Sequence, residues 1–255
     1  MRVAIVTGAD SGIGKATAVA LAARGFDVGI TWRSDEDGIR DTARQVESRG
    51  RRAEVRQVDL ADVRQGARVV AELADALGGV DVLVNNAGTG TAEPFVEMEL
   101  ETWQHVLDVD LTAAFMATQE AARRMIDAGG GGRIVNVTGV HEHVPLDGAA
   151  PYVAAKHGLG GFTKVAALEL AKHGITVNAV APGEIATPMT GNEDADVQQE
   201  DRPGLPAGRP GDAREIAAAI AFLASGEASY VTGESLVVDG GLMLMAAKAN
   251  QIAMR

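Results

Sequence analysis

The chain has 255 residues, of which 46% are hydrophobic and 4% aromatic, a length and an apolar content that suit one α/β domain with a sizeable core. Lysine and arginine number 23 against 35 aspartate and glutamate, which gives a formal net charge of -12. So acidic a chain repels nucleic-acid phosphates, and we expect no nucleic acid as a partner. The chain has no cysteine, which excludes disulfides and thiolate metal sites, and we expect no metal.

No apolar run reaches membrane-spanning length, so we expect no membrane partner. The first apolar run begins at Val3, which leaves no room for a signal peptide and predicts a cytoplasmic protein. The absence of cysteine is compatible with that reducing compartment.

That first run, residues 3–6, predicts a strand buried on both faces of a parallel sheet. It leads into Thr-Gly-Ala-Asp-Ser-Gly-Ile-Gly at residues 7–14, and a helix is predicted over residues 13–23. A strand, a glycine turn and a helix aim backbone N–H groups at a pyrophosphate. Glycines also form ordinary tight turns, but this context favours nucleotide binding. The candidate cofactor contacts are Gly8, Asp10, Ser11, Gly12, Ile13 and Gly14.

A second strand, predicted over residues 27–32, is followed by Arg33 and Ser34. In dinucleotide-binding folds this position faces the adenosine ribose, where an acidic residue binds the 2′-hydroxyl of NAD. A guanidinium and a hydroxyl instead suit a 2′-phosphate, so NADP(H) is favoured, with NAD(H) as the alternative. Acidic residues at 35–37 weaken the positive field, and a solvated Arg33 would also explain the pattern.

The third strand, residues 53–58, precedes Asp59 and Leu60, and the fourth, residues 80–84, precedes Asn-Asn-Ala-Gly. Asp59 can accept a hydrogen bond from an adenine amino group or can cap the segment after it. Small residues at the end of a strand let a cofactor lie against the backbone. The cofactor contacts predicted here are Asp59, Leu60, Asn86, Ala87 and Gly88, and helices are predicted over residues 36–49 and 63–77.

A long helix over residues 101–128 and a strand over 134–137 come before a helix, residues 151–172, that carries Tyr152 and Lys156. Residues four apart share a helix face, which sets a phenol beside an ammonium. A nearby cation favours the phenolate, so this tyrosine can give or take a proton near neutral pH. An ordinary amphipathic surface gives the same spacing, and only the preceding motifs favour catalysis.

The remaining chain predicts a strand at residues 175–180, a helix at 213–224, a short strand at 236–238 and a tail at 242–255. The polar, acidic stretch of about residues 188–212 is too long for a plain connection, so we expect a lid or substrate loop. No internal repeat or linker interrupts the chain, which predicts one domain over residues 1–255.

Strands that alternate with helices predict an α/β fold, a doubly wound parallel sheet of about seven strands with helices on both faces. Right-handed crossovers place the carboxyl ends of all strands at one edge. We expect the glycine turn, Arg33, Asp59, Asn86, Gly139 and Pro182 to meet there.

Four motifs in this order resemble the classical short-chain dehydrogenase/reductase family. They are the glycine turn at residues 7–14, Asn-Asn-Ala-Gly at 85–88, Tyr152-x-x-x-Lys156, and Pro182-Gly183 with Thr187. The resemblance spans nearly the whole chain. It implies a single Rossmann-type domain and NAD(P)-dependent hydride transfer to or from a carbonyl or alcohol carbon.

The resemblance also assigns roles. Tyr152 would be the acid/base, and Lys156 would hold the nicotinamide ribose and favour the phenolate. Ile185 and Thr187 would meet the carboxamide, beside Pro182 and Gly183. Family members commonly assemble through the two long helices, which implies a homotetramer or a dimer.

The first departure from the family is Gly139, which stands thirteen residues before Tyr152, where the family has a serine that holds the substrate oxygen. Thr138 is not assumed to replace it, because successive strand side chains face opposite ways. His141 and His143 could supply a donor or could be solvated. Restoring a serine at 139 is expected to raise ketone turnover. The substrate-pocket candidates are Thr138, His141, His143, Glu184 and Met189.

The second departure is Asp110, where the family usually has asparagine. An ionised aspartate only accepts hydrogen bonds, so the proton relay through Lys156 could be changed. We therefore expect an NADP(H)-preferring oxidoreductase with Gly139 and Asp110 at catalytic positions. One alternative is an imine reductase, because an iminium arrives protonated and needs no oxygen anchor. The other is a weak or inactive nucleotide-binding homologue, or a serine-to-glycine variant.

Overall fold

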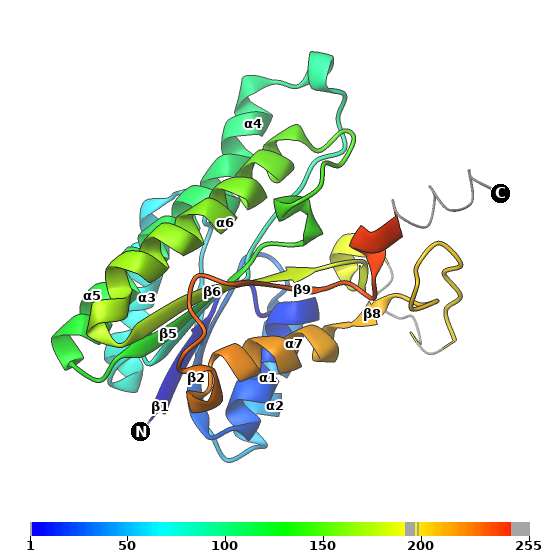
Figure 1. Ribbon diagram of the computed structural model, residues 1–255. Coiled ribbons are helices and arrows are strands. Elements are labelled where there is room, and N and C mark those ends of the chain that lie inside the picture. The colour runs from blue at the N-terminus through cyan, green and yellow to red at the C-terminus, as the bar shows by residue number, and fades with distance from the viewer. Residues whose placement is uncertain (1, 192–196, 198, 246–255) are drawn as a thin grey trace.

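The computed structural model describes residues 2–191, 197 and 199–245. Its centre is a seven-stranded sheet in which every neighbouring pair is parallel, with the order β3-β2-β1-β4-β5-β6-β9 (Figure 1). The predicted α/β fold with a doubly wound parallel sheet is confirmed. The strands are β1 (Arg2–Val6), β2 (Phe26–Trp32), β3 (Ala53–Gln57), β4 (Val82–Asn85), β5 (Gly132–Val137), β6 (Ile175–Pro182) and β9 (Ser235–Val238).

The two faces of the sheet are buried by different helices, because alternate residues of each strand face opposite ways. Ala4 and Val6 of β1 belong to one apolar core, and Ile5 between them belongs to the other. The first core contains residues of α1 (Gly12–Ala23), α2 (Glu36–Glu47) and α7 (Ala213–Leu223). The second core contains residues of α3 (Arg64–Leu77), α5 (Ala113–Ala128) and α6 (Ala150–Leu170). No helix of the described residues is long and apolar enough to span a membrane.

The strand order also fixes where a ligand can lie. From β1 the chain moves outward to β2 and β3, then returns past β1 to β4 and continues to the other side. Such a reversal opens a crevice outside the carboxyl ends of the two central strands, β1 and β4. The residues that follow β1 and β4 are the glycine turn and the Asn-Asn-Ala-Gly motif.

The prediction of a single regular helix over residues 101–128 is wrong in one detail. The structure has α4 (Leu100–Leu107), a π-helical turn η2 (Asp108–Thr112) and then α5. A π turn inserts an extra residue into a helix and often marks a functional site. Hydrophobic periodicity does not reveal it, because only the contacts made by Asp110 in this turn show why it forms.

The predicted substrate loop is anchored at both ends. Two short strands, β7 (Ile185–Ala186) and β8 (Gly211–Asp212), pair in parallel. Residues 192–196 and 198 of the loop, and residues 246–255 of the predicted tail, lie outside the described residues. The short helical turns are η1 (Phe95–Glu97), η3 (Val140–Glu142), η4 (Ala171–His173), η5 (Pro188–Thr190), η6 (Gly226–Ala228) and η7 (Leu242–Leu244).

Candidate active site

The glycine turn is packed too closely for side chains. Gly8 and Gly12 have φ of 63° and 51°, which favours glycine. A Cβ at Gly14 would lie 2.0 Å from the carbonyl oxygen of Gly8. At the start of α1, Ser11 makes no side-chain capping bond. The N–H groups of that first helical turn therefore remain available for an anion, which fits a dinucleotide pyrophosphate.

The residues that follow β4 hold this turn in place. The side-chain amide of Asn86 donates to the carbonyl oxygens of Thr7 (2.9 Å) and Gly8 (2.8 Å). The Thr7 hydroxyl accepts from the backbone N–H groups of Asn86 and Ala87, both at 3.0 Å. Asn86 thus holds the cofactor turn in place, and Thr7, which the sequence analysis left out, does the same from the other side.

At the ribose end, Arg33 and Ser34 are exposed directly after β2. Burial, with the neighbouring Asp35 carboxylate, raises the pKa of Asp10, whereas Arg33 acts in the opposite direction. The Asp35 side chain accepts from the N–H of Gly38 (2.9 Å) and so caps α2. The site predicted for a 2′-phosphate therefore holds one guanidinium between two carboxyl groups.

The adenine end shows a local structural role for Asp59. Its carboxylate accepts from the N–H of Ala61 at 3.0 Å, which matches the capping alternative. Asp59 is exposed, whereas Leu60 beside it is buried.

The centre of the site is a buried ion pair behind a tyrosine. The ammonium of Lys156 lies 3.0 Å from a carboxylate oxygen of Asp110, in side chains that are 5% and 0% exposed. Lys156 also donates to the carbonyl of Val137 (3.3 Å), and its ammonium is 5.3 Å from the ring centre of Tyr152. Burial opposes charge on Lys156, but Asp110 and Tyr152 overcome it and raise the lysine pKa above its usual value.

The π turn explains how an aspartate fits here. The second carboxylate oxygen of Asp110 accepts from the N–H of Thr89 at 2.7 Å, just beyond the Asn-Asn-Ala-Gly motif. A Cβ at Gly88 would lie 3.1 Å from the Asp110 carboxylate and 3.4 Å from the Lys156 ammonium. Asp110 therefore joins the loop after β4 to Lys156.

Gly139 lies where the resemblance places the serine, beside the phenol. A Cβ built on it would be 3.3 Å from the Tyr152 hydroxyl oxygen. Its φ of 98° is a conformation that side chains rarely adopt. The structure thus explains the glycine by its backbone, which the sequence could not show.

The two histidines among the pocket candidates contact different residues. His141 packs edge-on against Tyr152, with ring centres 6.0 Å apart, and its Nδ1 lies 3.2 Å from the carbonyl oxygen of Val144. A carbonyl only accepts, so Nδ1 carries the proton and Nε2 of a neutral ring is left as an acceptor. His143 instead contacts the Ser235 hydroxyl on β9 at 3.2 Å.

Thr138 does not serve the pocket. It is 1% exposed, and its hydroxyl lies 2.7 Å from the Glu142 carboxylate and 3.1 Å from the Val180 carbonyl. Glu142, which the sequence analysis did not select, is buried as well. The only sequence signal for it was its place between two histidines.

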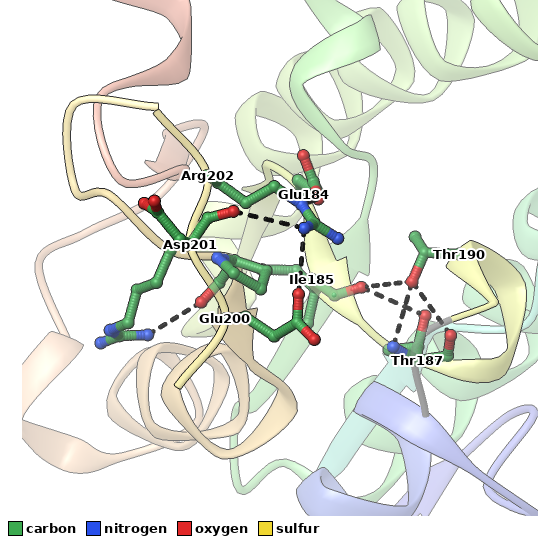
Figure 2. Close-up of polar contacts among 9 residues, drawn as sticks. Glu184, Ile185, Thr187, Thr190, Glu200, Asp201 and Arg202 are labelled. Atoms are coloured by element: carbon green, nitrogen blue, oxygen red, sulfur yellow. Dashed lines mark hydrogen bonds and ion pairs between the residues drawn. The ribbon is translucent and has the colours of Figure 1, made fainter. Parts of the chain in front are cut away.

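The segment after β6 lies over the glycine turn. The N–H of Gly183 donates to Val238 on β9 (3.0 Å), and a Cβ at Gly12 would lie 3.1 Å from the Thr187 methyl group. Figure 2 shows Thr190 turned back onto this segment, where its hydroxyl lies 2.7 Å from the Ile185 carbonyl. The predicted nicotinamide segment is therefore bonded to β9 at Gly183 and lies against the glycine turn at Thr187.

Of the two remaining residues expected in the substrate pocket, Glu184 pairs with an arginine of the loop and Met189 is exposed. Arg202 pairs with Glu184 at 2.8 Å and with Glu200 at 3.0 Å (Figure 2). Met189 is 66% exposed. Arg202, also missed from the sequence, thus ties the substrate loop to the residue directly after Pro-Gly. The described residues contain no group of side chains that could hold a metal ion.

Comparison with known proteins decides the family. A family described as Enoyl-(Acyl carrier protein) reductase matches residues 8–243. The chain belongs to the short-chain dehydrogenase/reductase family. It is 54% identical over 243 residues to the uncharacterized oxidoreductase YohF of Escherichia coli, with 95% of this chain and 96% of that protein covered.

Solved structures agree with this assignment. Acetoin dehydrogenase YohF from Salmonella typhimurium superposes with a TM-score of 0.91 at 53% identity, over 95% of this chain and 96% of the other. A dehydrogenase structure from Agrobacterium tumefaciens with bound NADP has a TM-score of 0.82 at 37% identity, over 95% and 96% of the two chains. The protein is an NAD(P)-dependent oxidoreductase of this family, as predicted.

Proposed function

We propose that the protein is an NADP(H)-preferring oxidoreductase that interconverts a carbonyl and an alcohol on a small organic substrate. The observation that carries the proposal is the buried Asp110–Lys156 pair behind Tyr152, at the same sheet edge as the glycine turn. A protein that only binds nucleotides has little need of a phenol placed there.

The cofactor and the side chains of the protein would carry out different parts of the reaction. Bound NADP(H) supplies or accepts the hydride. Tyr152 gives a proton to the carbonyl oxygen in reduction and takes it back in oxidation. Lys156, kept charged by Asp110, lies behind the ring of Tyr152 and would hold the nicotinamide ribose. The N-terminus of α1 binds the pyrophosphate.

The substrate class follows from a relative. The Salmonella typhimurium protein is named an acetoin dehydrogenase, and we extend small hydroxyketones of that type to this chain. Acetoin and related ketones, with the matching diols, form the first arm of a substrate panel followed at the absorbance band of reduced nicotinamide.

Gly139 gives an imine reductase a specific basis as the second candidate. With glycine there, no hydroxyl at this position can hold a substrate oxygen beside Tyr152. Cyclic imines are therefore the second arm of the panel. Turnover of imines but not ketones would replace the first proposal, and turnover of neither would favour a weak or non-catalytic nucleotide-binding homologue.

The NADP preference rests on Arg33, so Arg33→Ala should weaken NADPH binding much more than NADH binding. The reason is that only the 2′-phosphate needs the guanidinium. Titration of the protein with each cofactor, followed by cofactor fluorescence, measures the affinities for NADPH and NADH. Arg40→Ala, an exposed arginine on α2 paired with Glu36, is the control and should change neither. Equal losses for both cofactors in Arg33→Ala would refute the assignment.

The assembly is proposed to be a homotetramer or a dimer of single-domain chains. Apolar side chains on α5 and α6 face outward, with Phe115 40%, Val165 56% and Leu168 82% exposed. These helices are the ones through which family members commonly assemble. Light scattering measures the mass of the particle, and a monomer would contradict this proposal.

A further inference from the structure

The turn that follows Gly139 is fastened to the sheet by a buried carboxylate. Glu142 in η3 is 7% exposed, and one of its oxygens lies 2.7 Å from the Thr138 hydroxyl and 2.8 Å from the Ser235 hydroxyl. Thr138 follows β5 and Ser235 begins β9, so Glu142 joins two strands that the intervening β6 separates. Among the described residues, no lysine or arginine lies within 4 Å of this carboxylate, and the nearest imidazole is that of His143, at 3.8 Å.

The Ser235 hydroxyl links Glu142 to His143, which is exposed. A serine hydroxyl has a single proton, and an ionised carboxylate can only accept it. Ser235 therefore donates to Glu142 and accepts from Nε2 of His143, 3.2 Å away. One oxygen of Glu142 is thus bonded both to Thr138, which follows β5, and to Ser235 of β9.

Helix α6 leaves room for this carboxylate. A Cβ at Gly160 would lie 2.2 Å from the other oxygen of Glu142, closer than any real contact. A Cβ at the next residue, Gly161, would meet nothing within 4 Å. Gly160 is therefore needed for Glu142 to occupy its site, and the same helix carries Tyr152 two turns earlier.

We propose that Glu142 is a positioning residue that holds residues 139–143 against Tyr152. The segment lies beside the tyrosine at two points: a Cβ built on Gly139 would be 3.3 Å from the Tyr152 hydroxyl oxygen, and the ring of His141 packs edge-on against the tyrosine ring. Glu142 directly follows His141 and ties this segment to Thr138 and Ser235. The inference rests on the proposed function, in which Tyr152 is the acid/base, because only then does its position set the rate.

The chain allows a direct readout of that position, because Tyr152 and Tyr230 are its only tyrosines. In protein labelled with 3-fluorotyrosine, each gives one ¹⁹F resonance, and the fully exposed Tyr230 is an internal reference. Glu142→Ala and Gly160→Ala should both shift the Tyr152 resonance and leave that of Tyr230 in place. Gly161→Ala should shift neither.

Two further comparisons separate positioning from general stability. Glu142→Gln keeps a side-chain oxygen that can accept hydrogen bonds from both hydroxyls, so the Tyr152 resonance of this variant should match that of the wild type. In a Glu142→Ala background, Gly160→Ala should add no further change, because the oxygen it would meet is gone. In turnover, Glu142→Ala should lower kcat by roughly 10²-fold, the cost of a small misplacement at a reacting centre, with the Kd for NADPH unchanged.

An unshifted Tyr152 resonance in Glu142→Ala, with only a lower Tm, would overturn the proposal and leave Glu142 a purely structural residue. A shifted resonance with unchanged kcat would overturn it as well. If the wild-type protein turns over no substrate of the panel, the proposed function fails, and the ¹⁹F comparison still decides whether Glu142 positions Tyr152.

Discussion

At residue 139 the backbone limits what any side chain can contribute. A serine there would place a donor near the developing negative charge on the substrate oxygen, and losing such a donor typically costs about 10²–10³ in rate. The φ of 98° opposes that gain, since backbone strain of this kind costs about 1–3 kcal/mol. The expected benefit of a serine must therefore be measured apart from the strain.

Gly139→Ala provides that separation. Gly139→Ser and Gly139→Ala should both lower Tm by similar amounts, because both add a Cβ at the same strained position. Ketone turnover of the serine variant should exceed that of the alanine variant by about 10²-fold or more. Imine turnover should not distinguish them. Equal ketone turnover in the two variants would mean that a hydroxyl at 139 plays no part.

Asp110 lies beside the buried ammonium of Lys156 and raises its pKa. The raised pKa of Lys156 contributes stability that is fully present below about pH 10.4, the ordinary lysine value, and is lost as pH rises through the higher folded-state value. In Asp110→Asn the amide oxygen can still accept from Thr89, but burial of Lys156 is no longer offset by a carboxylate.

The alkaline limb of the kcat–pH profile of Asp110→Asn should therefore move to lower pH than in the wild-type enzyme. The variant should also lose the stability that the raised Lys156 pKa supplies, so its free energy of unfolding should fall furthest below that of the wild-type enzyme under about pH 10.4 and approach it at higher pH, which thermal unfolding at several pH values measures. Asp108→Asn, in the same π turn and bonded to Gln104 at the surface, is the control. Coincident profiles for Asp110→Asn and the wild-type enzyme would show that Lys156 does not depend on this carboxylate.

Among the secondary-structure elements, the substrate loop has the most specific attachment. Its ends are paired through β7 and β8, and Arg202 bridges Glu184 and Glu200 (Figure 2). Because Glu184 directly follows Pro182-Gly183, the loop and the nicotinamide segment are held together.

Arg202→Ala should loosen that attachment. Proteolysis within residues 188–212 should become faster and KM should rise, while Tm changes little because the pair is partly exposed and screened by solvent. Arg68→Ala, which breaks an exposed pair with Glu72 on α3, is the control. Unchanged proteolysis and KM in Arg202→Ala would show that the ion pair does not hold the loop.

The elements also show what a sequence can and cannot predict. Apolar runs and glycine turns report local structure, so the strands and the glycine turn were predictable from neighbouring residues. The π turn at Asp110, the φ of Gly139 and the partners of Glu142 depend on residues far apart in the chain. Neither periodicity nor spacing carries that information.

At the scale of the whole molecule, one sheet edge unites these features. The strand order places the ends of β1, β4, β5 and β6 side by side, and the glycine turn, Asn86, Gly139 and Pro182 lie at or just beyond those ends. Family membership and fold follow from this arrangement and from the comparisons. The roles of individual side chains remain proposals to be tested by substitution.

The most direct test of the central claim is the turnover of Tyr152→Phe. The substitution removes only the hydroxyl, so NADPH should bind with nearly unchanged affinity, while carbonyl reduction should fall by roughly 10²–10⁴-fold, the usual contribution of general acid catalysis. Absorbance of reduced nicotinamide under saturating substrate measures the rate. Wild-type turnover in Tyr152→Phe would contradict the account, because another group would then have to supply the proton.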